Sequence, residues 1–169
     1  MTHDLRLRAA TRSEIEHVRE IERASATRFL GTARAALADD DPTDAQTLAQ
    51  RIDSGGLLVA EDERRAVAFV MFREVEGCGY IEQIDVLPSH ARRGIGAALM
   101  EAVAELGRAR GWPALTLSTF KDVPFNAPYY RRLGFVDVET LTPGMAQIRA
   151  EHEARGLDER ARVFMRREI

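Results

Sequence analysis

A short basic turn joins a strand to a helix in the stretch Ile84-Asp85-Val86-Leu87-Pro88-Ser89-His90-Ala91-Arg92-Arg93-Gly94-Ile95-Gly96-Ala97-Ala98-Leu99. The apolar run over residues 80–87 ends at a proline and is typical of a strand. Over residues 96–110 the apolar side chains recur at helical spacing and a glycine follows, which predicts a helix. The stretch therefore predicts a strand–turn–helix unit.

The turn has the composition of an anion-binding site. Backbone N–H groups at a helix start lack partners within the helix, and the helix dipole adds positive potential there. Gly94 and Gly96 have no Cβ, so an anion can approach the backbone closely. Arg92 and Arg93 add fork-shaped donors. These features favour a pyrophosphate cradle. The alternative is a tight turn that only caps the helix, because the third glycine of the dinucleotide fingerprint and the Gly-Lys-Ser/Thr of a P-loop are absent.

Length and composition predict one globular domain over residues 1–169. Apolar residues make up 45% of the chain and charged residues 30%, which excludes collagen, a disulfide scaffold and a wholly disordered chain. No apolar run approaches the roughly 20 residues needed to cross a bilayer, so no membrane partner is expected. The segment Met1 to Arg8 carries charges and lacks the apolar core of a secretory signal, so we expect a cytoplasmic protein.

Charge is spread unevenly along the chain. Residues 1–88 hold 11 basic and 17 acidic side chains, whereas residues 89–169 hold 13 basic and 10 acidic ones. The net charge of −3 makes general nucleic-acid binding a poor expectation. The basic second half is consistent with a phosphate ligand and the acidic first half with a cationic one. The alternative is a solvated surface of both signs.

The pattern along the chain predicts a mixed α/β (α+β) domain. Its expected strands cover residues 5–8, 57–60, 66–75, 80–87, 115–119, 135–138 and 162–167, and its expected helices cover 12–27, 47–52, 96–110, part of 124–133 and 143–156. The first helix is expected to start at a capping box, Thr11-Arg12-Ser13-Glu14, and Asp39-Asp40-Asp41-Pro42 is a candidate start of the second. Three consecutive strands followed by β-α-β favour a mixed sheet with helices on its faces.

A second motif follows about 30 residues after the basic turn: Asn126-Ala127-Pro128-Tyr129-Tyr130-Arg131-Arg132-Leu133-Gly134-Phe135. With the turn Arg92-Arg93-Gly94-Ile95-Gly96, it resembles the GCN5-related N-acetyltransferases (the GNAT family), over roughly residues 5–168. That family's phosphate signature is Arg/Gln-x-x-Gly-x-Gly/Ala. Here Ala91 stands at the first position, so one side-chain contact to phosphate is missing, and Arg92, Arg93 or His90 are the candidates to replace it.

The resemblance implies acetyl-CoA as the donor and a primary amine as the acceptor. It implies a mostly antiparallel sheet with helices on both faces, in which the pantetheine arm inserts between two splayed parallel strands, here 80–87 and 115–119. The implied coenzyme-binding residues are the backbone of Ile84, Asp85 and Val86, the N–H groups of Arg92, Arg93, Gly94, Ile95, Gly96 and Ala97, and the side chains of Asn126 and Tyr130. A homodimer is a further expectation from the family.

Glu82 is the first candidate for the general base. An amine with a pKa near ~10.4 must lose a proton before it attacks the thioester. Glu82 lies on the predicted strand that would line the cleft, on the face it shares with Tyr80, Ile84 and Val86. The resemblance implies a base at the same position. Two alternatives stay open: a carboxylate that orients the substrate, and a structural ion pair.

Tyr130 is the candidate general acid, because a phenol can protonate the departing thiolate and because the resemblance implies this role four residues before Gly134. The alternative is an aromatic anchor in the core, and Tyr129 is the adjacent competitor. Asn126 has the donors and acceptor to hold the coenzyme arm; alternatively it caps the following helix.

Other reactive side chains point to no second chemistry. The four histidines, His3, His17, His90 and His152, show no His-x-x-x-His spacing, so no metal is expected. Cys78 lies between two glycines and is expected to be a plain turn residue. Arg149, His152 and Glu153 lie on a late predicted helix, which either borders the acceptor site or forms a solvated face.

The sequence therefore predicts a direct acetyl transfer from acetyl-CoA in a ternary complex. The leading acceptor is a small-molecule amine, since Glu20, Glu22 and residues 39–41 offer negative charge to a cation. A protein N-terminus or lysine is the second choice. The alternatives from other classes are a non-catalytic acyl-CoA-binding or sensing domain and a different nucleotide-binding fold.

Overall fold

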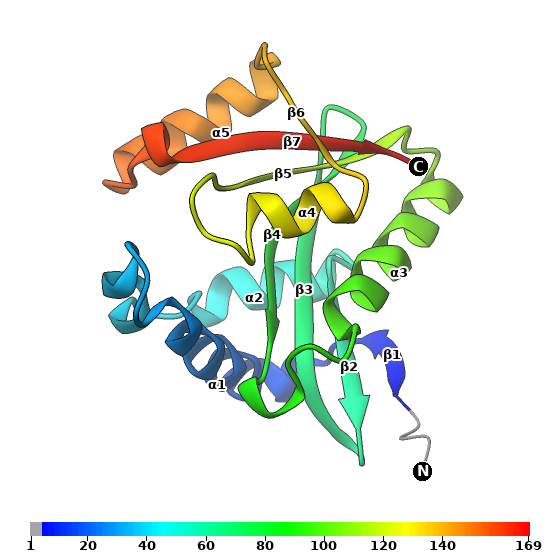
Figure 1. The fold of residues 1–169 in the computed structure, drawn as a ribbon. Helices are drawn as coiled ribbons and strands as arrows, with labels where there is room; N and C mark the ends of the chain where they lie inside the picture. The colour runs from blue at the N-terminus through cyan, green and yellow to red at the C-terminus, as the bar shows by residue number, and fades with distance from the viewer. Residues whose placement is uncertain (1–4) are drawn as a thin grey trace. The chain divides into compact units, whose positions relative to one another are not determined.

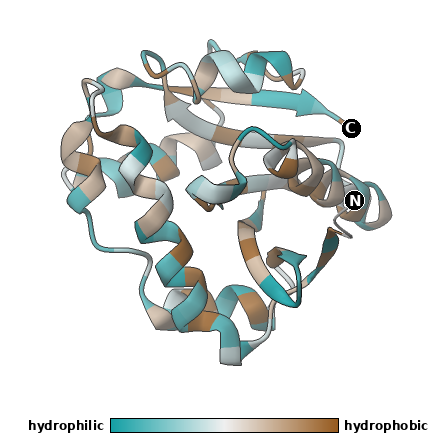
Figure 2. Cartoon of the chain, turned by 60° about the horizontal axis from the view of Figure 1, so that its bottom comes forward, coloured by the Kyte–Doolittle hydropathy of each residue, from teal (hydrophilic) through white to brown (hydrophobic). Residues whose placement is uncertain are grey.

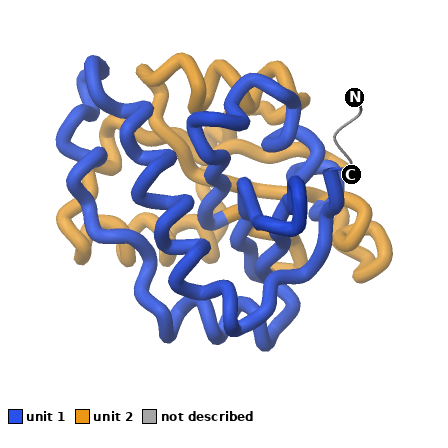
Figure 3. Tube along the Cα trace, turned by 90° about the horizontal axis from the view of Figure 1, so that it is seen from below, with its two compact units in different colours: residues 1–73, 82–103 blue, residues 74–81, 104–169 orange. Residues whose placement is uncertain are grey.

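A computed structural model describes residues 5–169 of the chain (Figure 1). The sequence-based expectations for Met1 to Asp4, including His3 and the start of the segment that lacks a secretory signal, lie outside the described residues. The described chain divides into two compact units, drawn in two colours in Figure 3. The first unit contains residues 1–73 and 82–103, and the second contains residues 74–81 and 104–169. We describe each unit by itself.

Seven strands form one mixed sheet in the order β1-β2-β3-β4-β5-β7-β6. Their bounds are β1 Arg6–Ala9, β2 Leu57–Asp62, β3 Arg65–Val75, β4 Cys78–Val86, β5 Ala114–Phe120, β6 Val136–Asp137 and β7 Arg162–Glu168. β4 and β5 pair in parallel, through Gly79–Ile81 and Leu115–Leu117. The β1–β2, β2–β3, β5–β7 and β6–β7 pairs are antiparallel. The predicted mixed sheet is confirmed, and the splay of the remaining residues of β4 and β5 stays a prediction.

In the first unit, helices α1 (Ile15–Ala26) and α2 (Ala45–Asp53) share a core with β2, β3 and Ala10, the residue after β1. Figure 2 shows hydrophobic and hydrophilic residues side by side along the helices, as amphipathic helices require. The helical side chains of this core recur at helical spacing in α1 and meet alternating strand residues. The core contains Ala10, Val18, Ile21, Leu48, Leu57, Val59, Ala66, Phe69 and Met71.

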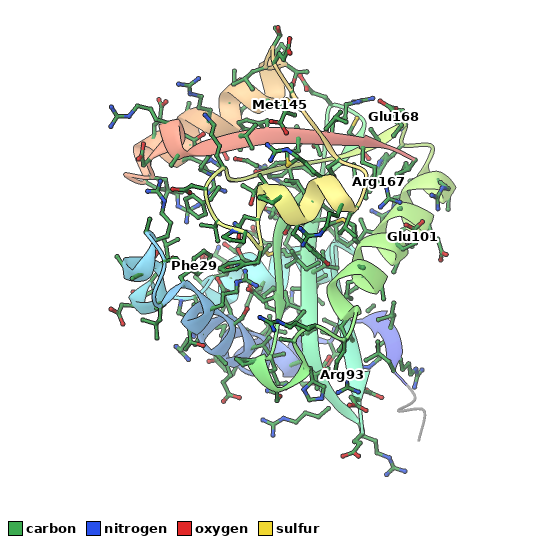
Figure 4. The ribbon with its side chains drawn as sticks, viewed as in Figure 1. Phe29, Arg93, Glu101, Met145, Arg167 and Glu168 are labelled. Atoms are coloured by element: carbon green, nitrogen blue, oxygen red, sulfur yellow. The ribbon has the colours of Figure 1, made fainter. Side chains whose placement is uncertain are left out.

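In the second unit, helix α5 (Pro143–Ala154) packs on the sheet through Met145 and Ile148, which form one buried cluster with Tyr80 and Phe164. Met145 is labelled in Figure 4. The other helical segment wholly inside this unit is α4 (Ala127–Arg132). Helix α3 (Ile95–Arg110) begins in the first unit and ends in the second. Apolar contacts with β4 and β7 therefore hold α5 on the sheet. The segment that follows α5 leads into β7.

Most element predictions are confirmed, and the differences have local causes. Residues 12–14 form a 3-10 turn, and the α-helix begins at Ile15. The predicted capping box at Thr11–Glu14 is formed, and in it Glu14 Oε2 accepts the Thr11 backbone N–H at 2.9 Å. Helix α2 starts at Ala45 rather than after Pro42, because Asp44 caps it by accepting the Thr47 N–H at 2.8 Å.

The turn predicted around Cys78 is displaced by one residue. Glu76 and Gly77 make the turn with left-handed backbone angles, φ of 51° and 71°. Cys78 begins strand β4, and its side chain is buried. Its position in the strand excludes the plain turn role that the sequence predicts for this cysteine.

Candidate functional site

The basic turn before α3 has the backbone of an anion cradle. Arg92 and Gly94 adopt left-handed angles, φ of 61° and 75°, and the helix starts at Ile95. The first hydrogen bond of the helix runs from the Ala98 N–H to the Gly94 carbonyl at 3.0 Å. The N–H groups of residues 95–97 therefore precede the helical ladder and are available to an anion.

Asp62, the last residue of β2, contacts two side chains of this turn. Its buried carboxylate lies 3.1 Å from His90 Nε2 and 3.8 Å from Arg93 Nη1, through the same oxygen. Arg93 projects from the turn and is labelled in Figure 4. Ser89 Oγ lies 2.8 Å from the other ring nitrogen of His90. Asp62 thus restrains His90 and Arg93, two of the side chains that were candidates for phosphate contacts.

Glu82 is held on both oxygens by one arginine. Arg51 Nε donates to Glu82 Oε1 at 2.5 Å, and Arg51 Nη2 donates to Oε2 at 2.9 Å. Arg73 Nε lies 3.6 Å from Oε2. The side chains of Arg51 and Glu82 are only 18% and 16% exposed, so this is a largely desolvated bidentate pair. The carboxylate of Glu82 is therefore held in place by the guanidinium of Arg51.

Asp85 points away from solvent on the same strand. Its carboxylate accepts the Ser25 hydroxyl at 2.8 Å and the Gln83 amide at 2.5 Å, and Arg28 lies 3.2 Å away. Burial raises the pKa of Asp85, while Arg28 and the two hydrogen bonds oppose the rise. Its side chain ties β4 to the end of α1, so only its backbone is left for the predicted contact with the coenzyme. Ile84 and Val86, on either side, are half-buried.

A second carboxylate belongs to the same buried region. Glu22 of α1 accepts the Thr43 N–H at 3.0 Å and the Thr43 hydroxyl at 3.2 Å. Burial raises the pKa of Glu22, and the negative charge of Asp85 adds to the rise. Glu22 therefore holds the segment before α2 in place, and its carboxylate is engaged within the protein rather than offered to a cationic ligand.

In the second unit, Asn126 precedes α4 without capping it. Its side chain makes no capping hydrogen bond; instead Nδ2 donates to Thr119 Oγ1 of β5 at 2.9 Å. The Asn126 Oδ1 atom is buried and has no hydrogen-bond partner within residues 5–169. A buried acceptor without a donor is costly in a folded protein. Because the Asn126 side chain makes no capping hydrogen bond, the alternative of a helix cap is wrong. The contact with the coenzyme arm stays a prediction.

Tyr130 is buried, with 9% of its surface exposed. Its ring makes edge-on contacts with Tyr129 and Phe135, at centroid distances of 5.4 and 5.9 Å. Tyr129 is more exposed, Arg132 lies over its ring, and burial raises the pKa of its phenol. The aromatic anchoring that was the alternative for Tyr130 is thus present, and it fixes the ring without deciding the role of the hydroxyl.

The predicted site residues fall in two groups. The first unit brings together Glu82, the backbone of residues 84–86 and the turn at 92–97. The second unit holds Asn126 and Tyr130 in one segment, joined by the hydrogen bond from the Tyr130 N–H to the Asn126 carbonyl at 3.0 Å. Each group is ordered by its own hydrogen bonds.

Sequence reasoning missed a half-buried arginine in the second unit, whose side chain is 16% exposed. Arg162, the first residue of β7, donates from Nε to Ser118 Oγ at 3.1 Å and from Nη2 to the Ser118 carbonyl at 2.9 Å. Its guanidinium lies 4.8 Å from the centre of the Phe120 ring. Arginine in an alternating edge-like strand normally indicates a solvated face, so the sequence carries no signal for this burial.

Two kinds of site are absent from the described residues. Within residues 5–169, no group of three or more His, Cys, Asp or Glu side chains is arranged to hold a metal ion. No helix in that part of the chain combines the length and apolar character that a membrane crossing requires.

A family model described as the acetyltransferase (GNAT) family matches residues 15–135, which include both sequence motifs. Among solved structures, the chain is similar to PaiA N-acetyltransferase from Thermoplasma acidophilum in complex with coenzyme A, with a TM-score of 0.75 and 13% identity. That match covers 98% of this chain and 99% of the other.

Two further structures share the fold. One is the ribosomal-protein-S18-alanine N-acetyltransferase of Escherichia coli, with a TM-score of 0.67, 19% identity and coverage of 98% and 94% of the two chains. The other is N-acetylglutamate synthase from Neisseria gonorrhoeae, complexed with coenzyme A and N-acetyl-glutamate, with a TM-score of 0.72 and 16% identity. The second match covers 97% of this chain and 35% of the synthase. At these identities the comparison shows a shared fold and nothing about the substrate.

Proposed function

Because the chain belongs to the acetyltransferase (GNAT) family, we propose that it transfers the acetyl group of acetyl-CoA to a primary amine by direct attack in a ternary complex. Family membership removes the alternative of an unrelated nucleotide-binding fold. The observation that carries the proposal is the turn at residues 92–97, in which Arg92 and Gly94 have left-handed backbone angles and the N–H groups of residues 95–97 precede the first hydrogen bond of α3.

The described residues fit coenzyme A in two respects. The N–H groups of residues 95–97 suit a diphosphate, which is the anion that the coenzyme carries. The buried Oδ1 of Asn126 lacks a donor, and the pantetheine arm contains two amide N–H groups of the required kind. Ala91 supplies no side-chain donor, so the backbone and Arg92 are the proposed phosphate contacts at this turn.

The transfer itself asks for three things: a neutral amine, stabilisation of the thioester oxygen and protonation of the thiolate. We assign the last step to Tyr130, whose ring is fixed by its aromatic contacts. A backbone N–H near Ile84 is the proposed donor to the thioester oxygen. Glu82 stays in the proposed site as a carboxylate that orients the acceptor together with Arg51, because both of its oxygens already accept hydrogen bonds.

For the acceptor we propose a small-molecule amine. The related structures differ in the acceptors that their names indicate: an alanine of a ribosomal protein in one case and glutamate in another. In this chain the exposed run of residues 39–41 offers three carboxylates that attract a cationic amine. A protein N-terminus or lysine is the second candidate, since the same charges attract either.

A thiol-release assay with acetyl-CoA and a panel of amines tests the proposal. The panel contains diamines, amino acids, aromatic amines and short peptides with free N-termini or lysines. We expect release with at least one small amine and tighter binding of coenzyme A than of ATP or NAD. Tight coenzyme binding without release for any acceptor would favour the non-catalytic acyl-CoA sensor, and release with peptides alone would replace the small-molecule acceptor by a protein one.

A further inference from the structure

A histidine–glutamate pair lies in the second unit, outside the residues assigned above. His152 stands near the end of α5, and its Nδ1 lies 2.6 Å from Oε1 of Glu159, in the turn before β7. The two side chains are only 12% and 5% exposed. With the carboxylate as acceptor, Nδ1 carries the proton and Nε2 carries a lone pair. Within residues 5–169, Nε2 of His152 has no hydrogen-bond partner and is not among the buried atoms.

Arg162 fixes the carboxylate of this pair. Its Nε lies 3.7 Å from Glu159 Oε1, the same oxygen that faces His152. The guanidinium is itself bound to Ser118 and packed over Phe120. The imidazole is therefore oriented by a carboxylate that is oriented in turn by an arginine anchored on β5. Such a relay holds one ring nitrogen and leaves the other to face a ligand.

The charges around the imidazole keep it neutral. Burial lowers the pKa of His152 below its usual value, and the positive charges of Arg162 and Arg155 lower it further, while Glu159 works in the opposite direction. A neutral imidazole at pH 7 can accept a proton. The phenols of Tyr80 and Tyr130 also act on the pKa of Arg162, so the proposed acid and this pair share one electrostatic neighbourhood within the second unit.

We propose that Nε2 of His152, oriented by Glu159, accepts the proton that the acceptor's ammonium group must lose before it attacks the thioester. This inference rests on the proposed acetyl transfer. The ammonium becomes a neutral amine and the imidazole becomes an imidazolium paired with Glu159. The amine nitrogen then forms the N–C bond and the C–S bond breaks with its electron pair on sulfur. The thiolate takes a proton from Tyr130, the second proton of the nitrogen passes to the resulting phenolate, and the imidazolium returns its proton to water.

Glu82 is the competing base, and its contacts count against it. Arg51 donates to both of its oxygens, so a proton on Glu82 would neutralise the negative charge that this largely desolvated guanidinium pairs with. Proton uptake at His152 breaks no contact, because Nε2 is unpartnered within residues 5–169 and the Nδ1–Glu159 hydrogen bond strengthens once the ring is charged. If His152 is the base, the acidic limb of the pH–rate curve disappears in a His152 variant. If Glu82 is the base, the limb disappears in a Glu82 variant.

The test compares His152→Asn with Glu82→Gln in the full chain. Asparagine keeps an N–H donor for Glu159 and lacks the basic Nε2. His17→Asn is the matched control, because His17 also contacts a glutamate, Glu20 at 3.1 Å, but its second nitrogen is occupied by the Ala66 carbonyl at 2.7 Å. The readouts are kcat/KM against pH with one accepted amine, and the Kd of coenzyme A.

We expect the unaltered protein to lose activity below about pH 6.5, and His152→Asn to be at least about 100-fold slower at neutral pH, with that limb gone and the coenzyme Kd unchanged. Added imidazole should restore part of the rate of His152→Ala. Glu82→Gln and His17→Asn should retain the acidic limb. A wild-type curve for His152→Asn, or loss of the limb in Glu82→Gln alone, would overturn the inference while acetyl transfer stands.

A second measurement is independent of turnover. The imidazole of His152 is titrated by NMR in the unaltered protein and in Glu159→Gln. We expect a pKa below 6.5 that falls further in Glu159→Gln, because the carboxylate raises it. A pKa at or above 6.5 would overturn the inference. If the unaltered protein binds coenzyme A but releases no thiol with any amine, the proposed transfer fails, and the inference fails with it.

Discussion

Single charged residues in this chain act through partners that come from distant elements. Glu82 meets Arg51 from α2, Asp85 meets Ser25 from α1, and Asp62 meets His90 across the β4–α3 turn. Each carboxylate is largely withdrawn from water, so its charge must be matched within the fold. The role of such a residue follows from its partner as much as from its own chemistry.

Gly94 offers a test of the anion turn at the scale of one residue. We expect Gly94→Ala to weaken coenzyme A binding by at least about tenfold. The change forces a Cβ onto a backbone with φ of 75°, which costs roughly 1–2 kcal/mol, and disturbs the alignment of the N–H groups. Calorimetric titration measures the Kd.

Gly111→Ala is the matched control for that change. Gly111 has a φ of 78° and, like Gly94, no neighbour within 4 Å of an added Cβ, but it ends α3 instead of beginning it. The control should lose similar stability and keep its coenzyme affinity. Equal losses of affinity in both variants would remove the special role of the turn.

Tyr130→Phe tests the acid role. We expect kcat to fall by at least about tenfold, with little change in the Kd of coenzyme A, because phenylalanine keeps the ring contacts to Tyr129 and Phe135 and lacks only the proton donor. Steady-state kinetics and calorimetry measure the two quantities. Tyr129→Phe is the control. A larger loss of kcat in Tyr129→Phe would transfer the acid role to that residue.

At the scale of elements, hydrophobic spacing predicts the helices and strands well. Val18 and Ile21 recur at helical spacing and are fully buried, and so do Leu99 and Val103 in α3. Spacing does not distinguish the 3-10 turn at 12–14 from the α-helix that follows, because the turn buries none of its residues and adds nothing to the apolar pattern. It also gives no indication of Asp44 as the cap of α2, since four acidic residues precede that helix.

Arg8, on β1, connects two further elements and makes a prediction about pH. It donates to Glu14 at 2.7 and 2.9 Å and to Glu61 of β2 at 2.8 Å. The hydrogen bond with Arg8 lowers the pKa of Glu14 to about 2, against an ordinary value of 4.5. A carboxylate whose pKa is lowered by folding stabilises the protein at pH values above its unfolded pKa. This contribution is lost as the pH falls toward the folded pKa.

Glu14→Gln should therefore lower the free energy of unfolding by roughly 0.5–1 kcal/mol at pH 7, a value discounted for the partial exposure of the pair. The difference from the unaltered protein should shrink between pH 4.5 and pH 2. Glu16→Gln is the control, because Glu16 is 71% exposed beside Arg19. Urea unfolding at several pH values measures the difference, and a constant difference down to pH 2 would contradict the linkage.

At the scale of the whole molecule, the motifs were predictable and the network that supports them was not. The turn at 92–97 and the segment from Asn126 to Phe135 are contiguous in sequence, so their composition reveals them. Arg51, Asp62 and Arg162 owe their positions to contacts between elements far apart in sequence. The pair of His152 and Glu159 was unpredictable for the same reason, because the two side chains meet only in the folded chain, between α5 and the turn before β7.

A ligand that binds only the folded chain must raise the melting temperature of the protein. Comparing the rise caused by coenzyme A with that caused by a fragment of it shows which part of the coenzyme supplies the affinity. At a coenzyme A concentration 100 times its Kd, mass action adds about 2.7 kcal/mol. For a chain of 169 residues this corresponds to a rise of roughly 5–10 °C.

Pantetheine lacks the diphosphate that the turn at 92–97 is proposed to hold, so at the same concentration it should raise the melting temperature far less. Thermal scans at low and moderate salt measure both ligands, and the coenzyme effect should weaken with salt because part of it is electrostatic. Equal protection by pantetheine would mean that the arm, and not the turn, supplies the affinity.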